Sequence, residues 1–156
     1  MQKENNTAAK LSDRGILSAR VLPWSKEVLF NTFADPVLLS RWWGPKGFTN
    51  SFREFDFQPG GQWDLVMHGP DGKDHHNHSV FVNITSPERI VFDHLDPVHS
   101  FRMTISFEEY GTGTLISFHM LFDDAEECRR VKPYILDGNE ENFDKLETLL
   151  TGNAVS

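Results

Sequence analysis

The chain has 156 residues, a length that fits one domain with a sizeable core. Its formal net charge of −8 disfavours nucleic acids and anionic membranes as partners, because a negative field repels phosphate groups. Cys128 is the only cysteine, which excludes an internal disulfide and suits a reducing compartment. The polar start and the lack of an apolar stretch of about 18 residues argue against a signal peptide and a transmembrane helix, so we expect a cytoplasmic protein.

The first part of the chain predicts one strand and one helix after a disordered lead, residues 1–14. Ile16, Ser18, Arg20 and Leu22 alternate with Leu17, Ala19 and Val21, which predicts a strand with one buried face that Pro23 ends. Ser25 is a good N-cap for the following helix, whose apolar stripe consists of Val28, Leu29, Phe33 and Ala34.

A second short helix is predicted directly afterwards. Asp35 is an N-cap with Pro36 in the first turn, where a missing N–H costs nothing, and Gly44-Pro45 stops the helix after two tryptophans. This helix therefore brings Trp42 and Trp43 to one place. Further on, Gly60-Gly61 permits a tight turn that leads to Trp63 at the start of a strand.

The middle of the chain has a period of two and turn residues at regular intervals, which predicts strands. With the first strand these segments form a seven-stranded antiparallel sheet, and they cover residues 48–57, 62–68, 74–85, 89–95, 99–110 and 113–122. Such a sheet must cover one apolar face, and only the C-terminal helix, residues 123–150, remains to do so. Pro133 is expected to break or restart this helix, and residues 151–156 read as a tail. Its buried face is predicted to contain Ile135, Asn139, Phe143, Leu146 and Leu150.

This arrangement predicts an α+β helix-grip fold, in which a curved sheet wraps around a long helix, as one domain over residues 15–150. The sequence also resembles the SRPBCC, or START-like, superfamily, and within it the homologues of the heat-shock protein 90 ATPase activator. The resemblance rests on Arg20, Val28-x-Phe30, Asp35-Pro36, Trp42-Trp43-Gly44-Pro45, Phe55-Asp56-x-x-Pro59-Gly60-Gly61-x-Trp63, Gly69-Pro70-Asp71-Gly72, Pro87-Glu88-Arg89-Ile90-Val91, Gly138 and Leu146. It implies a cavity between sheet and helix, and members of the superfamily use such cavities to bind lipids, hormones and polyketides or to catalyse unrelated reactions, so the fold does not name the ligand.

Aromatic residues are frequent, with 13 Phe and 4 Trp, and such residues must fill a thick core or line a pocket. We expect a cavity whose polar groups orient a ligand and whose walls are mainly aromatic and methionine side chains. The predicted lining consists of Trp42, Trp63, Met67, His78, Phe81, Phe92, His94, Phe101, Met103, Phe118, Met120, Asn139 and Phe143, with Arg102 at the rim.

Which histidines face this cavity depends on the hairpin around Pro70-Asp71-Gly72. A two- or four-residue loop would place His76 and His78 beside Met67 and Leu65. A three-residue turn with a bulge at Gly72 would instead place His75 and Asn77 there. The sequence leaves both registers open. A metal site would need one particular arrangement of these histidines, and neither a metal nor a cofactor is expected.

The leading hypothesis is a protein that binds a small hydrophobic or aromatic molecule. The alternative is an enzyme of the cyclase, dehydratase or hydrolase kind, in which His78 or His94 works with Glu54 or Asp56. Cys128 is a poor nucleophile candidate because its acidic surroundings raise the thiol pKa. A chaperone co-factor role is disfavoured, since such relatives carry a separate N-terminal domain that 14 polar residues do not supply. An edge strand is able to pair in a homodimer, but no residue demands it.

Overall fold

The computed structural model describes residues 12–95 and 100–155, so most of the predicted lead and the start of the predicted segment 99–110 lie outside the described residues. Within the described part, the chain forms the elements β1 (Gly15–Leu22), α2 (Lys26–Ala34), α3 (Pro36–Trp42), β2 (Thr49–Phe55), β3 (Gln62–His68), β4 (Asp74–Thr85), β5 (Arg89–His94), β6 (Phe101–Tyr110), β7 (Gly113–Phe122) and α4 (Ala125–Val155). None of the described helices is long and apolar enough to cross a membrane.

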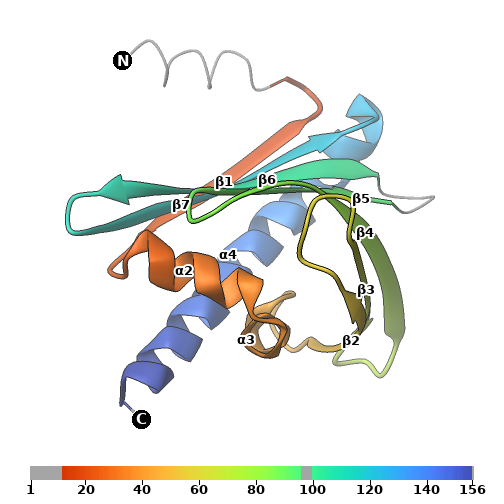
Figure 1. Ribbon diagram of the computed structural model, residues 1–156. Helices are drawn as coiled ribbons and strands as arrows, with labels where there is room; N and C mark the ends of the chain where they lie inside the picture. Colours follow the sequence, from red (N-terminus) through yellow and green to blue (C-terminus); the bar gives the residue numbers. More distant parts are fainter. Residues whose placement is uncertain (1–11, 96–99, 156) are drawn as a thin grey trace.

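The strands form one antiparallel sheet in the order β1-β7-β6-β5-β4-β3-β2. The sheet is strongly curved, and all three helices lie on its concave side (Figure 1). Along β7 the alternation is regular, because Ile116, Phe118, Met120 and Phe122 are buried and the residues between them are partly exposed. The predicted α+β helix-grip fold is confirmed.

The two short helices begin at the predicted caps. The Val28 backbone N–H donates to Ser25 Oγ at 3.2 Å, and the Val37 N–H donates to Asp35 Oδ1 at 2.9 Å. Each bond satisfies a backbone donor that the first turn of a helix leaves free. Pro36 occupies the first position of α3.

The hairpin between β3 and β4 adopts one of the two registers that the sequence left open. Gly69 N–H donates to the carbonyl of Lys73 at 2.8 Å, and Gly72 has a φ of +84°, so the loop is a three-residue turn with a glycine bulge. Met67 therefore pairs with His75, and Leu65 pairs with Asn77.

Helix α4 differs from the prediction in two ways. Pro133 does not break it, because the helix runs without interruption from Ala125 to Val155 and so also continues beyond the predicted end at Leu150. Pro133 removes one backbone N–H, but its neighbours before and after it are held by packing. Cys128 is buried on one side of the proline, and Asn139, Phe143 and Leu146 are buried on the other. Tertiary contacts of this kind outweigh the local preference of a proline.

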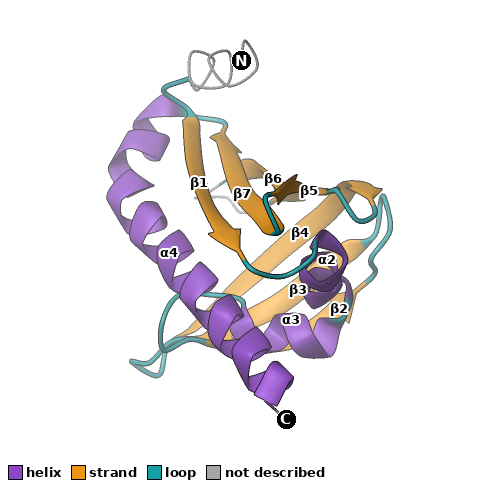
Figure 2. Ribbon diagram, turned by 90° about the vertical axis from the view of Figure 1, so that its left-hand side faces the viewer, coloured by secondary structure: helices purple, strands orange, loops and turns teal. Residues whose placement is uncertain are grey.

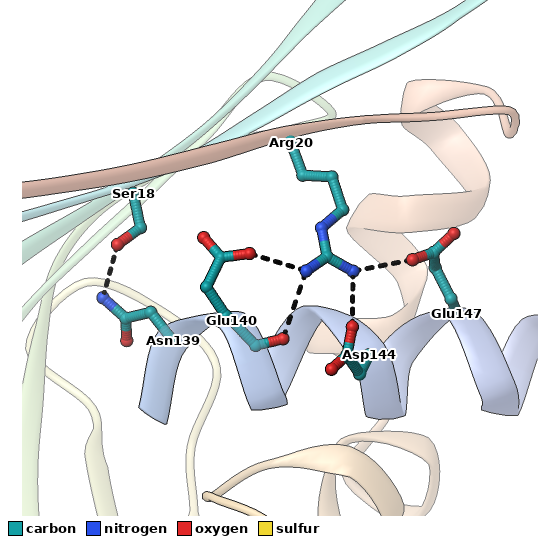
Figure 3. Close-up of polar contacts among 6 residues, drawn as sticks. All are labelled: Ser18, Arg20, Asn139, Glu140, Asp144 and Glu147. Atoms are coloured by element: carbon teal, nitrogen blue, oxygen red, sulfur yellow. Dashed lines mark hydrogen bonds and ion pairs between the residues drawn. The ribbon is translucent and has the colours of Figure 1, made fainter. Parts of the chain in front are cut away.

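A single arginine on β1 holds α4 against the sheet (Figure 3). The Arg20 guanidinium donates to carboxylate oxygens of Glu140 at 2.6 Å, Asp144 at 2.8 Å and Glu147 at 2.7 Å. It also lies 5.3 Å from the ring centroid of Phe143. Partial burial opposes the charge, but the hydrogen bonds to the three carboxylates outweigh it together and raise the pKa of Arg20. Ser18 lies two residues before Arg20 on the same face of β1, and its Oγ accepts a hydrogen bond from Asn139 Nδ2 at 3.1 Å.

The turn before β3 gives a stability prediction. A Cβ on Gly61 would lie 2.0 Å from the carbonyl oxygen of Asp56, whereas a Cβ on Gly60 would meet nothing within 4 Å. We expect Gly61→Ala to lower the free energy of unfolding by about 3 kcal/mol, because the backbone must move to relieve the clash. Gly60→Ala, which only places Ala at a positive φ, should cost about 1 kcal/mol. Urea denaturation of both variants checks the difference, and equal losses would contradict it.

Candidate functional site

A pocket of about 270 Å³ lies between the concave face of the sheet and the first half of α4. The strands contribute aromatic, aliphatic and thioether side chains, and α4 contributes one stripe of residues spaced by three and four. The lining consists of Trp43, Gly44, Pro45, Trp63, Leu65, Met67, Asn77, Ser79, Phe92, His94, Phe101, Met103, Met120, Phe122, Val131, Tyr134, Ile135, Gly138, Asn139 and Asn142.

The pocket follows from where α4 lies. In Figure 2 the helix runs beside β1, and Figure 1 shows that β4, β3 and β2 bend away from the plane of β1, β7 and β6. The Arg20 contacts and the Asn139–Ser18 hydrogen bond hold α4 at the β1 side. The side chains of β3 to β6 therefore face the helix across a space that packing does not fill.

The loop between α3 and β2 forms a further wall and is hydrogen-bonded to α4. Asn142 Oδ1 accepts from the Gly44 N–H at 2.8 Å, and Lys145 Nζ donates to the carbonyl of Phe48 at 3.1 Å. Glu141 accepts from the Lys46 N–H at 3.0 Å. Burial lowers the pKa of Lys145, and Glu141 partly opposes this effect. Three side chains on one helix thus position the loop.

The lining is polar at only a few points. No Asp, Glu, Lys or Arg side chain belongs to it within the described residues. His94 is buried and stacks on Phe101, with ring centroids 4.7 Å apart. The amides of Asn139 and Asn142 are also buried. Tyr134, with 78% of its surface exposed, marks the side at which the pocket meets solvent.

The structure divides the predicted cavity residues into two groups. One group lines the pocket and consists of Trp63, Met67, Phe92, His94, Phe101, Met103, Met120 and Asn139.

The other group differs from the expectation, because these side chains lie in the packed core beside the pocket. Trp42 packs against Phe33 with ring centroids 4.7 Å apart, and Phe118 packs against Phe143 at 4.8 Å. Phe81 is stacked on Trp63 at 6.0 Å. Arg102, expected at the rim, pairs with Asp93, and both are outside the pocket lining.

His78 also differs from the expectation. Its neighbours Asn77 and Ser79 line the pocket, and alternate residues of a strand point to opposite faces, so His78 lies on the outer face of the sheet. Its Cα partner there is Asp64. Within the described residues, no three His, Cys, Asp or Glu side chains come together in a way that suits a metal ion.

Some lining residues are not among those that the sequence predicted. Trp43, the residue after α3, lines the pocket in place of Trp42, because the helix buries Trp42 on its inner side. The spacing of three from Asn139 to Asn142 was a usable signal, since both residues share one helix face. Whether Asn77 faces the pocket depends on the hairpin register, which the local sequence did not decide.

The predicted catalytic candidates lie elsewhere. Glu54 and Asp56 are exposed and are not among the pocket residues. Asp56 Oδ2 accepts from Gln58 Nε2 at 3.1 Å within the turn. Cys128 is buried, and burial raises the pKa of its thiol, which Lys132 partly opposes and Asp13 supports, so burial and not the acidic stretch of the sequence is the main cause. The His and carboxylate pairs required by the enzyme hypothesis are therefore not found in the pocket within the described residues.

Comparison with known proteins places this geometry in a family context. A family model described as Activator of Hsp90 ATPase homolog 1-like protein matches residues 23–151. No similar protein is found among curated sequences.

Solved structures with the same fold come from several bacteria. A protein from Arthrobacter aurescens has a TM-score of 0.83 at 20% identity, over 92% of this chain and 89% of that one. A protein from Nitrosomonas europaea has a TM-score of 0.81 at 21% identity, over 90% and 96%. An AHSA1 protein from Silicibacter pomeroyi has a TM-score of 0.72 at 22% identity, over 89% and 99%. At these identities the likeness shows the fold alone.

Proposed function

Since the chain belongs to the family of Activator of Hsp90 ATPase homolog 1-like proteins, whose fold can enclose a ligand, we propose that it binds a small, uncharged, largely apolar molecule in the pocket. The observation that carries this proposal is the lining itself. Aromatic, aliphatic and thioether side chains surround about 270 Å³ of space that the core does not fill.

The lack of Asp, Glu, Lys and Arg side chains in the described lining supports a neutral ligand. A charged group that leaves water for such a site loses its hydration without gaining a counter-ion, which costs several kcal/mol. An apolar ring system gains from the same transfer, at roughly 25 cal/mol per Å² of buried surface. The pocket therefore favours a neutral aromatic molecule over its ionised relatives.

Two amides are arranged to orient the ligand. Asn142 uses its oxygen to accept from Gly44 N–H, and Asn139 uses its nitrogen to donate to Ser18. This leaves Nδ2 of Asn142 as a donor and Oδ1 of Asn139 as an acceptor on the pocket wall. A ligand that carries both an acceptor and a donor satisfies these groups and gains specificity.

The volume limits the size of the ligand. Pockets for drug-sized molecules enclose about 300–1,000 Å³, and this pocket, at about 270 Å³, lies just below that range. We therefore expect a molecule of one to three fused or linked rings, not a long acyl chain.

Two probes with the same aromatic skeleton test the proposal. N-phenyl-1-naphthylamine is neutral, and 1-anilinonaphthalene-8-sulfonate adds one sulfonate to it. We expect saturable binding of the neutral probe, seen as increased probe fluorescence and quenched emission of Trp43 and Trp63, which line the pocket. The sulfonate should bind at least about tenfold more weakly, since tenfold is only 1.4 kcal/mol.

Competition and thermal melting serve as controls. Unlabelled neutral naphthalene derivatives should displace the probe, and melting curves should show a folded protein under the same conditions. Lack of saturable binding of the neutral probe would contradict the proposed function, and equal affinity for both probes would contradict the requirement for a neutral ligand.

A further inference from the structure

Three side chains on the outer face of the sheet form an Asp-His-Ser hydrogen-bond chain. Asp74 Oδ1 lies 2.7 Å from His68 Nδ1, and Ser51 Oγ lies 2.8 Å from His68 Nε2. The residues come from β4, β3 and β2, which are neighbours in the sheet. His68 pairs directly with Asp74 across one strand boundary and with Thr49, two residues from Ser51, across the other. Strand alternation places them opposite Met67, which faces the pocket.

The carboxylate determines which nitrogen of neutral His68 carries the proton. An ionised carboxylate only accepts hydrogen bonds, so the Nδ1 beside Asp74 must hold the hydrogen. The Nε2 atom is then an acceptor and receives the hydroxyl hydrogen of Ser51. These three hydrogen-bonded residues are therefore arranged as in a site where a carboxylate orients a histidine base and that base removes a proton from a serine.

We propose that Ser51 is a nucleophile towards small activated acyl or phosphonyl donors, at a site separate from the pocket. Ser51 Oγ forms a bond to the electrophilic carbon or phosphorus while its proton passes to His68 Nε2. The bond to the leaving group then breaks with its electron pair, and the leaving group departs as the anion or takes the proton from His68. Where the leaving group departs as the anion, His68 first gives its proton to solvent. Water then attacks the acyl group on Ser51 while its proton passes to His68 Nε2, the bond between the acyl carbon and Ser51 Oγ breaks, and His68 returns that proton to Ser51 Oγ.

The surroundings of Ser51 define the class of donor. Ser51 is exposed, and the side chains of His68 and Asp74 are 38% and 62% exposed. None of the three residues belongs to the lining of the pocket between the sheet and α4. A substrate therefore gains little binding energy there, and only donors with good leaving groups, such as aryl esters or fluorophosphonates, are expected to react.

A fluorophosphonate with a short alkyl chain tests this inference on the folded protein. Peptide mapping by mass spectrometry should find the label on Ser51, and Ser51→Ala should remove it. His68→Asn should abolish labelling, because general-base help is worth about 10²- to 10⁴-fold. As a positioning residue, Asp74 should show a smaller effect, with Asp74→Asn slowing labelling about tenfold at an unchanged melting temperature and Asp74→Glu restoring the rate.

A second His-Asp pair on the same face provides a matched control. Asp64 Oδ1 lies 2.5 Å from His76 Nε2, and Ser51 is not part of that pair. Asp64→Asn should leave the labelling of Ser51 at the parental rate. An unlabelled Ser51, or equal slowing by Asp64→Asn and Asp74→Asn, would overturn the inference. Neither result bears on the pocket, because binding of the neutral naphthylamine is measured independently.

Discussion

Gly138→Leu is expected to weaken binding of the neutral naphthylamine at least about tenfold without loss of stability. Gly138 lines the pocket from α4, and a Cβ built there meets only Pro45 Cγ, at 3.8 Å, which is ordinary contact. A leucine side chain therefore extends into space that the ligand would otherwise fill. Overfilling a packed site costs about 1–3 kcal/mol, and 1.4 kcal/mol corresponds to a factor of ten in affinity.

The same substitution should keep or improve the fold, since glycine in a helix costs about 1 kcal/mol relative to a good helix former. Gly152→Leu is the matched control, because Gly152 is in the same helix, is exposed, and a Cβ there meets nothing within 4 Å. Fluorescence titration and thermal melting of both variants give the answer. Parental affinity in a stably folded Gly138→Leu protein would place the ligand outside this pocket.

Arg20→Met is expected to lower the free energy of unfolding by about 2–3 kcal/mol. The Arg20 side chain is only 22% exposed and serves three carboxylates of α4. Removing it leaves Glu140, Asp144 and Glu147 on neighbouring turns without their shared counter-charge. Loss of one partner of a buried ion pair costs about 3–5 kcal/mol, and the exposure of these carboxylates, at 41–67%, reduces that figure.

Arg102→Met provides the comparison. Arg102 forms two hydrogen bonds with Asp93, at 2.7 and 3.0 Å, but its side chain is 50% exposed, so its loss should cost less than about 1 kcal/mol. Urea denaturation measures the free energy of unfolding of both variants. Added salt should recover part of the loss in Arg20→Met, because salt screens the repulsion among the carboxylates. Equal losses in the two variants would contradict the role of Arg20 as the contact that holds α4 to β1.

Local sequence was enough for the order of the elements and for the starts of the two short helices. Ser25 and Asp35 cap their helices, and glycines such as Gly72 occupy turns with positive φ. These features depend on contacts within a few residues, so their physical cause is readable in the chain itself. The periods of two and of about 3.6 likewise identified the strands and the buried face of α4.

The pocket and the outer hydrogen-bond chain depended on contacts between distant segments. The sequence allowed two hairpin registers, and a shift of one residue exchanges the faces of every side chain, which decided that Asn77 lines the pocket and His78 does not. Pro133 predicted a break that packing on both of its sides overrides. The sequence by itself determined a curved sheet with a terminal helix and many aromatic side chains. Only the tertiary structure decided which of these side chains line the pocket and which pack together in the core, because that depends on where Arg20 and Ser18 hold α4 relative to the curved sheet.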